Sequence, residues 1–182
     1  FPTRRSSDLD VPKIRYIWQS LPSQLARENK KFLYSVVKPG ARAREYENAL
    51  NWLRDADIIS KVCRVSRPGL PLSAYDDLSA FKIYAVDVGI LRCLSHLPVT
   101  AFAEKNRLFT EFKGALTENY AHQSLKRSFA VAPRYWADAA HEVDFVAQRE
   151  NDIIPIEAKA GESVTATSLK RYAKNYGEQT TL

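Results

Sequence analysis

Two apolar segments near the C-terminus, each carrying carboxylates, constrain the fold of this chain most. The first spans residues 142–146 (EVDFV) and the second spans residues 153–159 (IIPIEAK). Side chains alternate between the two faces of a strand, so Glu157 and Lys159 are expected to project from the same face. A short turn joins the segments, which favours a hairpin. The pairing predicts that Asp144 lies beside Glu157.

A third acid is expected on the inward side of a preceding helix. The helical pattern over residues 108–129 has a stripe with spacings of three and four, made of Ala115, Glu118, His122, Leu125 and Phe129. A charged group on an inward stripe needs a partner, and a metal ion or Lys159 would serve as that partner for Glu118.

These residues predict a metal-dependent hydrolytic site. Neighbouring carboxylates that are partly buried repel each other unless a cation lies between them, and hard oxygen ligands suit Mg²⁺ or Mn²⁺. A lysine nearby can orient or deprotonate a water for phosphodiester hydrolysis. The predicted metal ligands are Glu118, Asp144 and Glu157, and the predicted catalytic residues are Asp144, Glu157 and Lys159. The alternative is a solvated hairpin with a surface ion pair.

The two halves of the chain have different patterns. In the second half, a helix over 108–129 precedes strands over 131–136, 141–148 and 152–159 and a helix over 164–176, which is the order α-β-β-β-α. In the first half, a helix start is expected at Ser20–Pro22, followed by a helix over 41–56 and strands over 58–65 and 81–86. That order is typical of a winged helix-turn-helix, so the predicted class is α+β.

The basic excess lies in the first half. Residues 10–75 hold twelve basic and six acidic residues, whereas residues 76–182 hold thirteen basic and fourteen acidic residues. Such a surface attracts polyanions, and DNA is the expected partner. Asp55 and Asp57 would repel phosphate, so the alternative is a winged helix used for packing or dimerisation. The residues predicted to contact nucleic acid are Arg42, Arg44, Arg64, Arg67, Lys170 and Lys174.

The carboxylates and the lysine resemble a known superfamily. Glu118 on a helix, then Asp144 and Glu157-x-Lys159, is similar to the PD-(D/E)XK phosphodiesterase core, although Val143 stands where a proline often precedes the aspartate. The resemblance implies a restriction-endonuclease-like fold with the order α-β-β-β-α-β. We expect the chain to stop before the last strand, so that this core is truncated at the C-terminus.

Six motifs, three of which contain these carboxylates, carry a wider resemblance. In order along the chain they resemble the C-terminal region of bacterial and archaeal AAA-type ATPases, catalogued as domain of unknown function 4143. The resemblance implies an N-terminal ATPase domain as partner and ATP binding through that domain only, because no G-x-x-x-x-G-K-[ST] loop occurs here. The motifs are ENKKF (28–32), REYENALNWL (44–53), PLSAYDDLSAFKIYAVDVGIL (71–91), KGALTENYA (113–121), EVDFV (142–146) and PIEAKAG (155–161).

Four segments are predicted. Residues 1–9 (FPTRRSSDL) look like the translation of a sequencing adapter, and the chain contains no methionine, so we expect a fragment with a non-native leader. A winged-helix domain is expected over 10–92, a linker over 93–104 and an incomplete nuclease-like domain over 105–182. The expected function is that of a magnesium-dependent nuclease-like domain associated with an AAA-type ATPase. The alternative is a non-catalytic module that binds DNA or protein and regulates the ATPase.

The composition excludes several other classes. Charged residues interrupt every apolar stretch, so no segment is long enough for a transmembrane helix. Cys63 and Cys93 are too few for a disulfide framework or a zinc cluster, and two reduced thiols favour a cytoplasmic location. A homo-oligomer is compatible with the sequence.

Overall fold

A computed structural model describes residues 7–28, 30–103, 109–161, 166–177 and 180–181 of the chain. Helices and strands alternate irregularly along it, and a short 3₁₀ helix over Leu72–Tyr75 leads into the second strand. The helices and strands are α1 (Ser7–Leu25), α2 (Tyr34–Val37), α3 (Ala43–Asp55), β1 (Ile59–Val65), β2 (Asp76–Ala85), α4 (Val88–Leu94), α5 (Thr100–Ala103), α6 (Thr110–Ser128), β3 (Arg134–Ala137), β4 (Glu142–Arg149), β5 (Asp152–Ile156) and α7 (Thr167–Tyr176).

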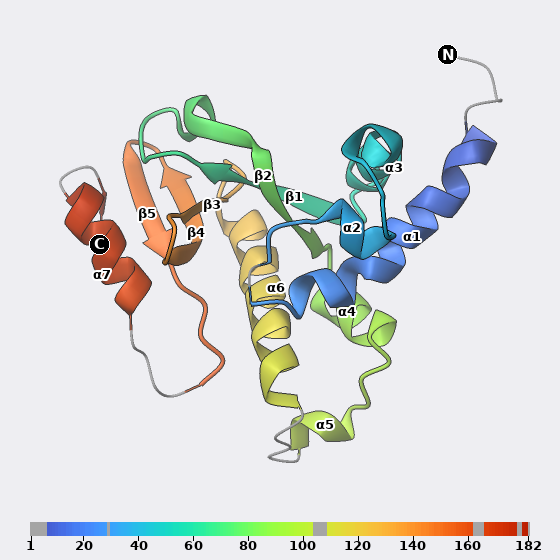
Figure 1. The fold of residues 1–182 in the computed structure, drawn as a ribbon. Helices are drawn as coiled ribbons and strands as arrows, with labels where there is room; N and C mark the ends of the chain where they lie inside the picture. The colour runs from blue at the N-terminus through green and yellow to red at the C-terminus, as the bar shows by residue number, and fades with distance from the viewer. Residues whose placement is uncertain (1–6, 29, 104–108, 162–165, 178–179, 182) are drawn as a thin grey trace.

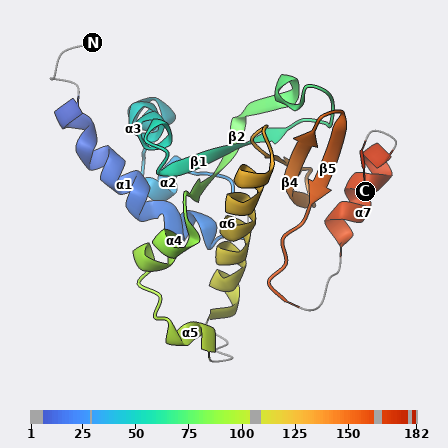
Figure 2. The ribbon, with the colours of Figure 1, turned by 180° about the vertical axis from the view of Figure 1, so that it is seen from behind.

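All five of these strands belong to one mixed sheet with the order β2-β1-β3-β4-β5. β1 pairs antiparallel with β2 and parallel with β3, and the β3–β4 and β4–β5 pairs are antiparallel. Figure 1 shows α6 crossing below the middle of the sheet, with α7 beside β5 and with α1, α3 and α4 at the other end. The view from behind in Figure 2 shows the same arrangement. The chain is therefore an α+β protein.

The predicted strands of the two halves meet in this sheet. β1 and β2 were expected as wing strands of a separate domain, yet Arg64 and Val65 of β1 pair with Tyr135 and Trp136 of β3. The winged helix and the endonuclease-like core are not confirmed as such. The α-β-β-β-α order expected for the second half is present in α6, β3, β4, β5 and α7, and β5 ends at Ile156, three residues before the expected end.

The expected helix start at Ser20–Pro22 is wrong, because α1 begins at Ser7, inside the segment expected to be non-native. Ile17, Leu21 and Leu25 recur every four residues and are buried, so their packing carries the helix through this point. The hydroxyl of Ser20 donates to the carbonyl of Ile17 at 2.8 Å and does not cap a helix. The expected helix over residues 41–56 is confirmed as α3, whose buried residues are Tyr46, Ala49, Leu50 and Leu53.

α6 is anchored to β2 by a buried amide. The side chain of Asn119 accepts a hydrogen bond from the Ala85 amide at 2.9 Å and donates to the Ala85 carbonyl at 3.2 Å. Both groups are buried, so the pairing satisfies polar atoms that would otherwise destabilise the fold. It also sets the rotation of α6 about its axis, and Glu118, the preceding residue, is thereby directed into the protein interior as its stripe predicted.

Candidate metal centre

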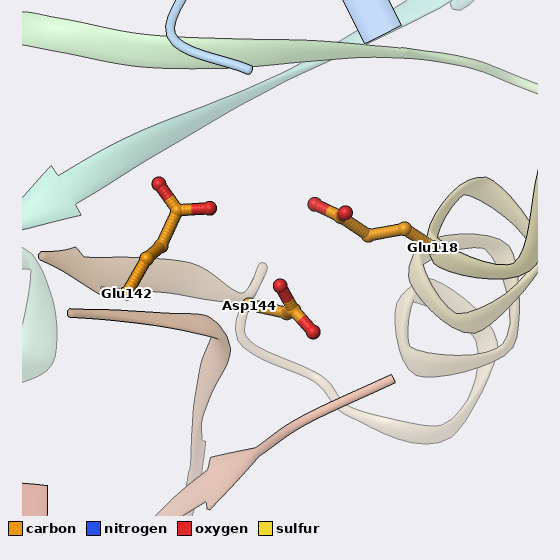
Figure 3. A group of neighbouring side chains, drawn as sticks. All are labelled: Glu118, Glu142 and Asp144. Carbon is orange, nitrogen blue, oxygen red and sulfur yellow. The ribbon is translucent and has the colours of Figure 1, made fainter. Parts of the chain in front are cut away.

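Three carboxylates converge where α6 faces β4. Glu118 extends from α6, while Glu142 and Asp144 are two residues apart on β4 and therefore share one face of that strand. One oxygen from each of the three lies within 4.8 Å of the others, and Figure 3 shows the carboxylates facing a common space. Glu118 is buried and the other two are half-buried. We refer to these three residues as the acidic cluster.

Two lysines from the N-terminal half neutralise part of this charge. Lys82 is a fully buried residue of β2, and its Nζ donates to Glu118 Oε1 at 2.9 Å and to Glu142 Oε1 at 2.5 Å. Lys30, which follows α1, donates to Glu118 Oε2, and the hydroxyl of Tyr84 donates to Glu118 Oε1. Both oxygens of Glu118 are thus hydrogen-bonded, as a buried carboxylate requires.

Burial and neighbouring charges act in opposite directions on the pKa values of the cluster. Burial raises the pKa of Glu118, but the ammonium groups of Lys82 and Lys30 outweigh burial and lower it to about 2. Burial lowers the pKa of Lys82, but Glu118 and Glu142 raise it overall. The pKa of Asp144 is raised to about 6 by burial and by the charge of Glu118. Two lysines therefore face three acidic side chains in this cluster.

The donor set fits a hard divalent cation. Asp144 Oδ2 accepts a hydrogen bond from the Ala158 amide at 2.8 Å, and in the described part of the chain no group donates to Asp144 Oδ1 or Glu142 Oε2. Two oxygens bound to one Mg²⁺ lie about 3.0 Å apart when adjacent and about 4.2 Å apart when opposite, whereas the three oxygens of the cluster lie within 4.8 Å of one another, so the cluster would have to contract around the ion. The ammonium of Lys82, however, already lies between Glu118 and Glu142, and it would have to share their oxygens with the cation.

The structure places the predicted residues Glu157 and Lys159 next to the acidic cluster but not in it. β5 ends with Ile156 paired to Phe145 of β4, and the amide of Ala158 donates to Asp144, so the segment after β5 runs alongside Asp144. Glu157 Oε1 pairs with Lys159 Nζ at 2.5 Å, while Glu157 Oε2 is buried without a hydrogen-bond partner among the described residues. Lys159 pairs with Glu157 and not with Glu118, although it was one of the two partners expected for Glu118, the other being a metal ion.

The residues predicted to contact nucleic acid lie far apart. Arg42 and Arg44 are exposed at the start of α3, whereas Lys170 and Lys174 are exposed on α7, and Figure 1 places these two helices at opposite ends of the molecule. Arg64 and Arg67 already have intramolecular partners. Arg64 pairs with Asp77 at 2.5 Å, and the guanidinium of Arg67 lies 4.4 Å from the ring centroid of Tyr75.

Sequence reasoning missed Glu142, Lys82 and Lys30. The alternation that placed Glu157 and Lys159 on one face applies equally to Glu142 and Asp144, so Glu142 could have been found from the sequence. Lys82 interrupts an apolar strand, which is a recognisable signal for a buried charge that needs partners. Nothing in the sequence around Lys30 distinguishes it from an exposed lysine, because its contact with Glu118 depends on the tertiary fold.

His122, on the same stripe of α6 as Glu118, predicts a pH dependence of stability. Its ring stacks on Tyr84 with centroids 4.8 Å apart, and burial together with Lys126 lowers its pKa to about 4, although Asp57 and Glu118 act in the opposite direction. A depressed histidine pKa means that the unfolded chain binds more protons. The stabilisation that His122 contributes to the folded chain is complete above about pH 6.5 and is lost as the pH falls through about 4.

Between pH 6.5 and pH 4, protonation of His122 should cost the parent chain on the order of 3 kcal/mol of its free energy of unfolding. We therefore expect His122→Phe to lack this part of the acid-dependent loss. Urea unfolding at several pH values measures this effect. His96→Phe, a variant of an exposed histidine, is the control. A pH profile of His122→Phe that coincides with that of the parent chain contradicts the assignment.

Comparison with known families gives two matches. The model described as Domain of unknown function (DUF8612) matches residues 4–101, which is more than half of the chain, and the model described as Domain of unknown function (DUF4143) matches residues 113–181. No curated protein and no solved structure matches the chain. No helix in the described ranges is both long and apolar enough to cross a membrane. Lys30 and Lys82 lie in the first matched region and the acidic cluster lies in the second. The chain thus belongs to the DUF8612 family and carries a DUF4143 domain, two domains of unknown function that share one sheet and one buried charge cluster.

Proposed function

We propose that this chain carries a divalent-cation-dependent phosphodiesterase site of the PD-(D/E)XK type that acts on nucleic acid, with DNA as the expected substrate. The observation that carries the proposal is the convergence of Glu118, Glu142 and Asp144 beside the segment that bears Glu157 and Lys159. The α-β-β-β-α order from α6 to α7 supports the endonuclease-like description of this half.

Each side chain has a role in this proposal. Glu118, Glu142 and Asp144 would hold Mg²⁺ or Mn²⁺, with Glu157 and its unpartnered Oε2 as a further ligand. The bound cation would supply Lewis acidity toward the phosphate and would lower the pKa of a bound water. Lys159, whose Nζ already contacts Glu157, would orient that water and accept or return its proton.

The proposal is tested on the purified chain in two assays. Titration with Mg²⁺ or Mn²⁺ in a calorimeter should give a binding isotherm, and supercoiled plasmid should be nicked only when one of these cations is present. Glu142→Gln should weaken cation binding by about tenfold or more, since it removes a charged ligand. Glu47→Gln on the exposed surface of α3 is the matched control. Absence of cation binding to the parent chain would rule the metal site out.

A second candidate function has its own supporting observation. The ammonium of Lys82 bridges Glu118 and Glu142 and can replace a metal ion as their counter-charge. This arrangement supports a non-catalytic module in which the first half, with its winged-helix-like order, binds DNA or a protein. The resemblance to AAA-type proteins implies an ATPase domain as the regulated partner and as the site of ATP binding. DNA binding without cation binding or nicking would favour this candidate.

A further inference from the structure

The two oxygens of the buried Glu118 carboxylate have partners of different kinds. Oε1 accepts hydrogen bonds from the Nζ of Lys82 at 2.9 Å and from the hydroxyl of Tyr84, and both donors belong to fully buried residues of β2. Oε2 accepts from the Nζ of Lys30, whose side chain retains 18% of its exposure. Oε1 is therefore fixed from inside the protein, whereas Oε2 is held by a group that reaches solvent.

The charge of Lys30 acts on a second member of the acidic cluster. Burial and the charge of Glu118 raise the pKa of Asp144 to about 6, whereas Lys82 and Lys30 act in the opposite direction. The ammonium of Lys30 therefore acts on the carboxyl groups of both Glu118 and Asp144, as a bound cation would. In the described part of the chain, no group donates to Asp144 Oδ1, so this oxygen is free to bind a cation.

Lys30 has room and a second partner outside the cluster. It lies between α1 and α2, where the backbone forms neither helix nor strand. It also lines a hollow of about 440 Å³ at the end of α1, and Glu28 of the same hollow offers another carboxylate to a released ammonium. Lys82 is enclosed in β2 without exposure. Lys30 is therefore the lysine that can leave Glu118 by rotation of its flexible stem.

The charges favour an exchange with a divalent cation. Two lysines face three acidic side chains, so a divalent cation added to both lysines would bring more positive charge than the acids can balance. Replacement of one ammonium by the cation leaves three positive charges facing three ionised acids. A monovalent cation brings only the charge that the ammonium already supplies, so its exchange gains nothing.

We propose that Lys30 holds the place of the divalent cation at Glu118 Oε2 and is released when the cation binds, while Lys82 stays in place. The inference rests on the proposed function, because that function supplies the metal centre. It adds a residue that sets the affinity of this centre and its preference for divalent over monovalent cations. The DUF8612 half thereby controls the loading of acids that lie in the DUF4143 half.

Acylation of lysine amines in the full chain, followed by mass spectrometry, tests the release. An amine held against a buried carboxylate reacts slowly, so Lys30 should be labelled slowly without divalent cations. Its labelling should rise as Mg²⁺ is added, with a midpoint at the dissociation constant that calorimetry gives for Mg²⁺. KCl at equal ionic strength should not release it. Lys82 should stay unlabelled throughout, and the exposed Lys113 should react equally in all samples.

The affinity for Mg²⁺ gives a second measurement. Lys30→Gln should bind Mg²⁺ about tenfold more tightly than the parent chain, because the cation no longer displaces a charge-assisted hydrogen bond. Glu118 keeps Lys82 and Tyr84 as partners in this variant, so the chain should still fold. Lys113→Gln removes an exposed lysine of α6 and is the matched control, with an affinity equal to that of the parent chain.

The outcomes separate this inference from the proposed function. Mg²⁺ binding without a rise in the labelling of Lys30, or with labelling of Lys82 instead, overturns the inference and leaves the metal centre standing. Equal affinities of Lys30→Gln and Lys113→Gln overturn it as well. Absence of Mg²⁺ binding to both the parent chain and Lys30→Gln removes the inference together with the metal centre. Release of Lys30 by Mg²⁺ in a chain that does not nick plasmid supports the inference and contradicts the nuclease proposal.

Discussion

Replacement of Lys82 by methionine is expected to destabilise the folded chain by about 3–5 kcal/mol, the largest effect on stability that we predict. The substitution leaves the buried Glu118 with Lys30 and Tyr84 as its partners and removes an ammonium that contacts Glu142. It also removes a cation that lies 4.9 Å from the ring centroid of Tyr135. Most of the cost arises because a buried carboxylate loses its counter-charge.

Chemical denaturation at neutral pH measures this effect. Lys113→Met, on the exposed face of α6, is the matched control and should change the free energy of unfolding by less than about 0.5 kcal/mol. Adding Glu118→Gln to Lys82→Met should restore part of the loss, since the double variant no longer buries the uncompensated charge. A Lys82→Met variant as stable as its control would show that this lysine is not a buried counter-charge.

The same variant distinguishes the two candidate functions. If the acidic cluster binds divalent cations, Mg²⁺ should stabilise Lys82→Met more than the parent chain, because the ammonium no longer competes for Glu118 and Glu142. Binding to the folded state alone raises the free energy of unfolding in proportion to the logarithm of the cation concentration. A variant that Mg²⁺ does not stabilise would favour the non-catalytic module, in which Lys82 is the permanent counter-charge.

Local patterns predicted most of the elements but not their assembly. The patterns that predicted a helix over 41–56 and a strand over 58–65 are local, and the structure confirms both elements, as α3 and β1, within about two residues. The parallel pairing of β1 with β3 depends on residues about seventy positions apart, for which no local pattern exists. The two predicted domains therefore share a sheet that inspection of each half could not reveal.

For a similar reason, only part of the candidate site could be predicted from the sequence. Helical spacing located Glu118 and strand alternation located Asp144, and both lie in the acidic cluster. The pairing of Lys82 with Glu118 joins β2 to α6, and that of Lys30 joins the segment after α1 to the same helix. Such contacts are set by tertiary packing, so the sequence could supply the acids of the cluster but not the bases that neutralise them.

Asp144→Asn is expected to reduce Mg²⁺-dependent nicking on the order of 100-fold or more, the largest effect on activity that we predict. The amide removes a charged ligand, yet its side-chain oxygen can still accept the hydrogen bond from the Ala158 amide, so the local backbone should be retained. The fold should in fact gain stability. The pKa of Asp144 is raised from 3.8 to about 6, which means that its ionised form is disfavoured in the folded state.

The sign of that gain follows from linkage. The stabilisation associated with a raised carboxyl pKa is present below about pH 3.8 and is lost as the pH rises through about 6, so at pH 7 the ionised Asp144 destabilises the fold. Asp144→Asn should therefore raise the free energy of unfolding at pH 7 by on the order of 1–3 kcal/mol while activity falls. Asp55→Asn, at the exposed end of α3, should change neither quantity. A loss of activity that comes with a loss of stability would point to misfolding, and full activity in Asp144→Asn would remove this residue from the catalytic site.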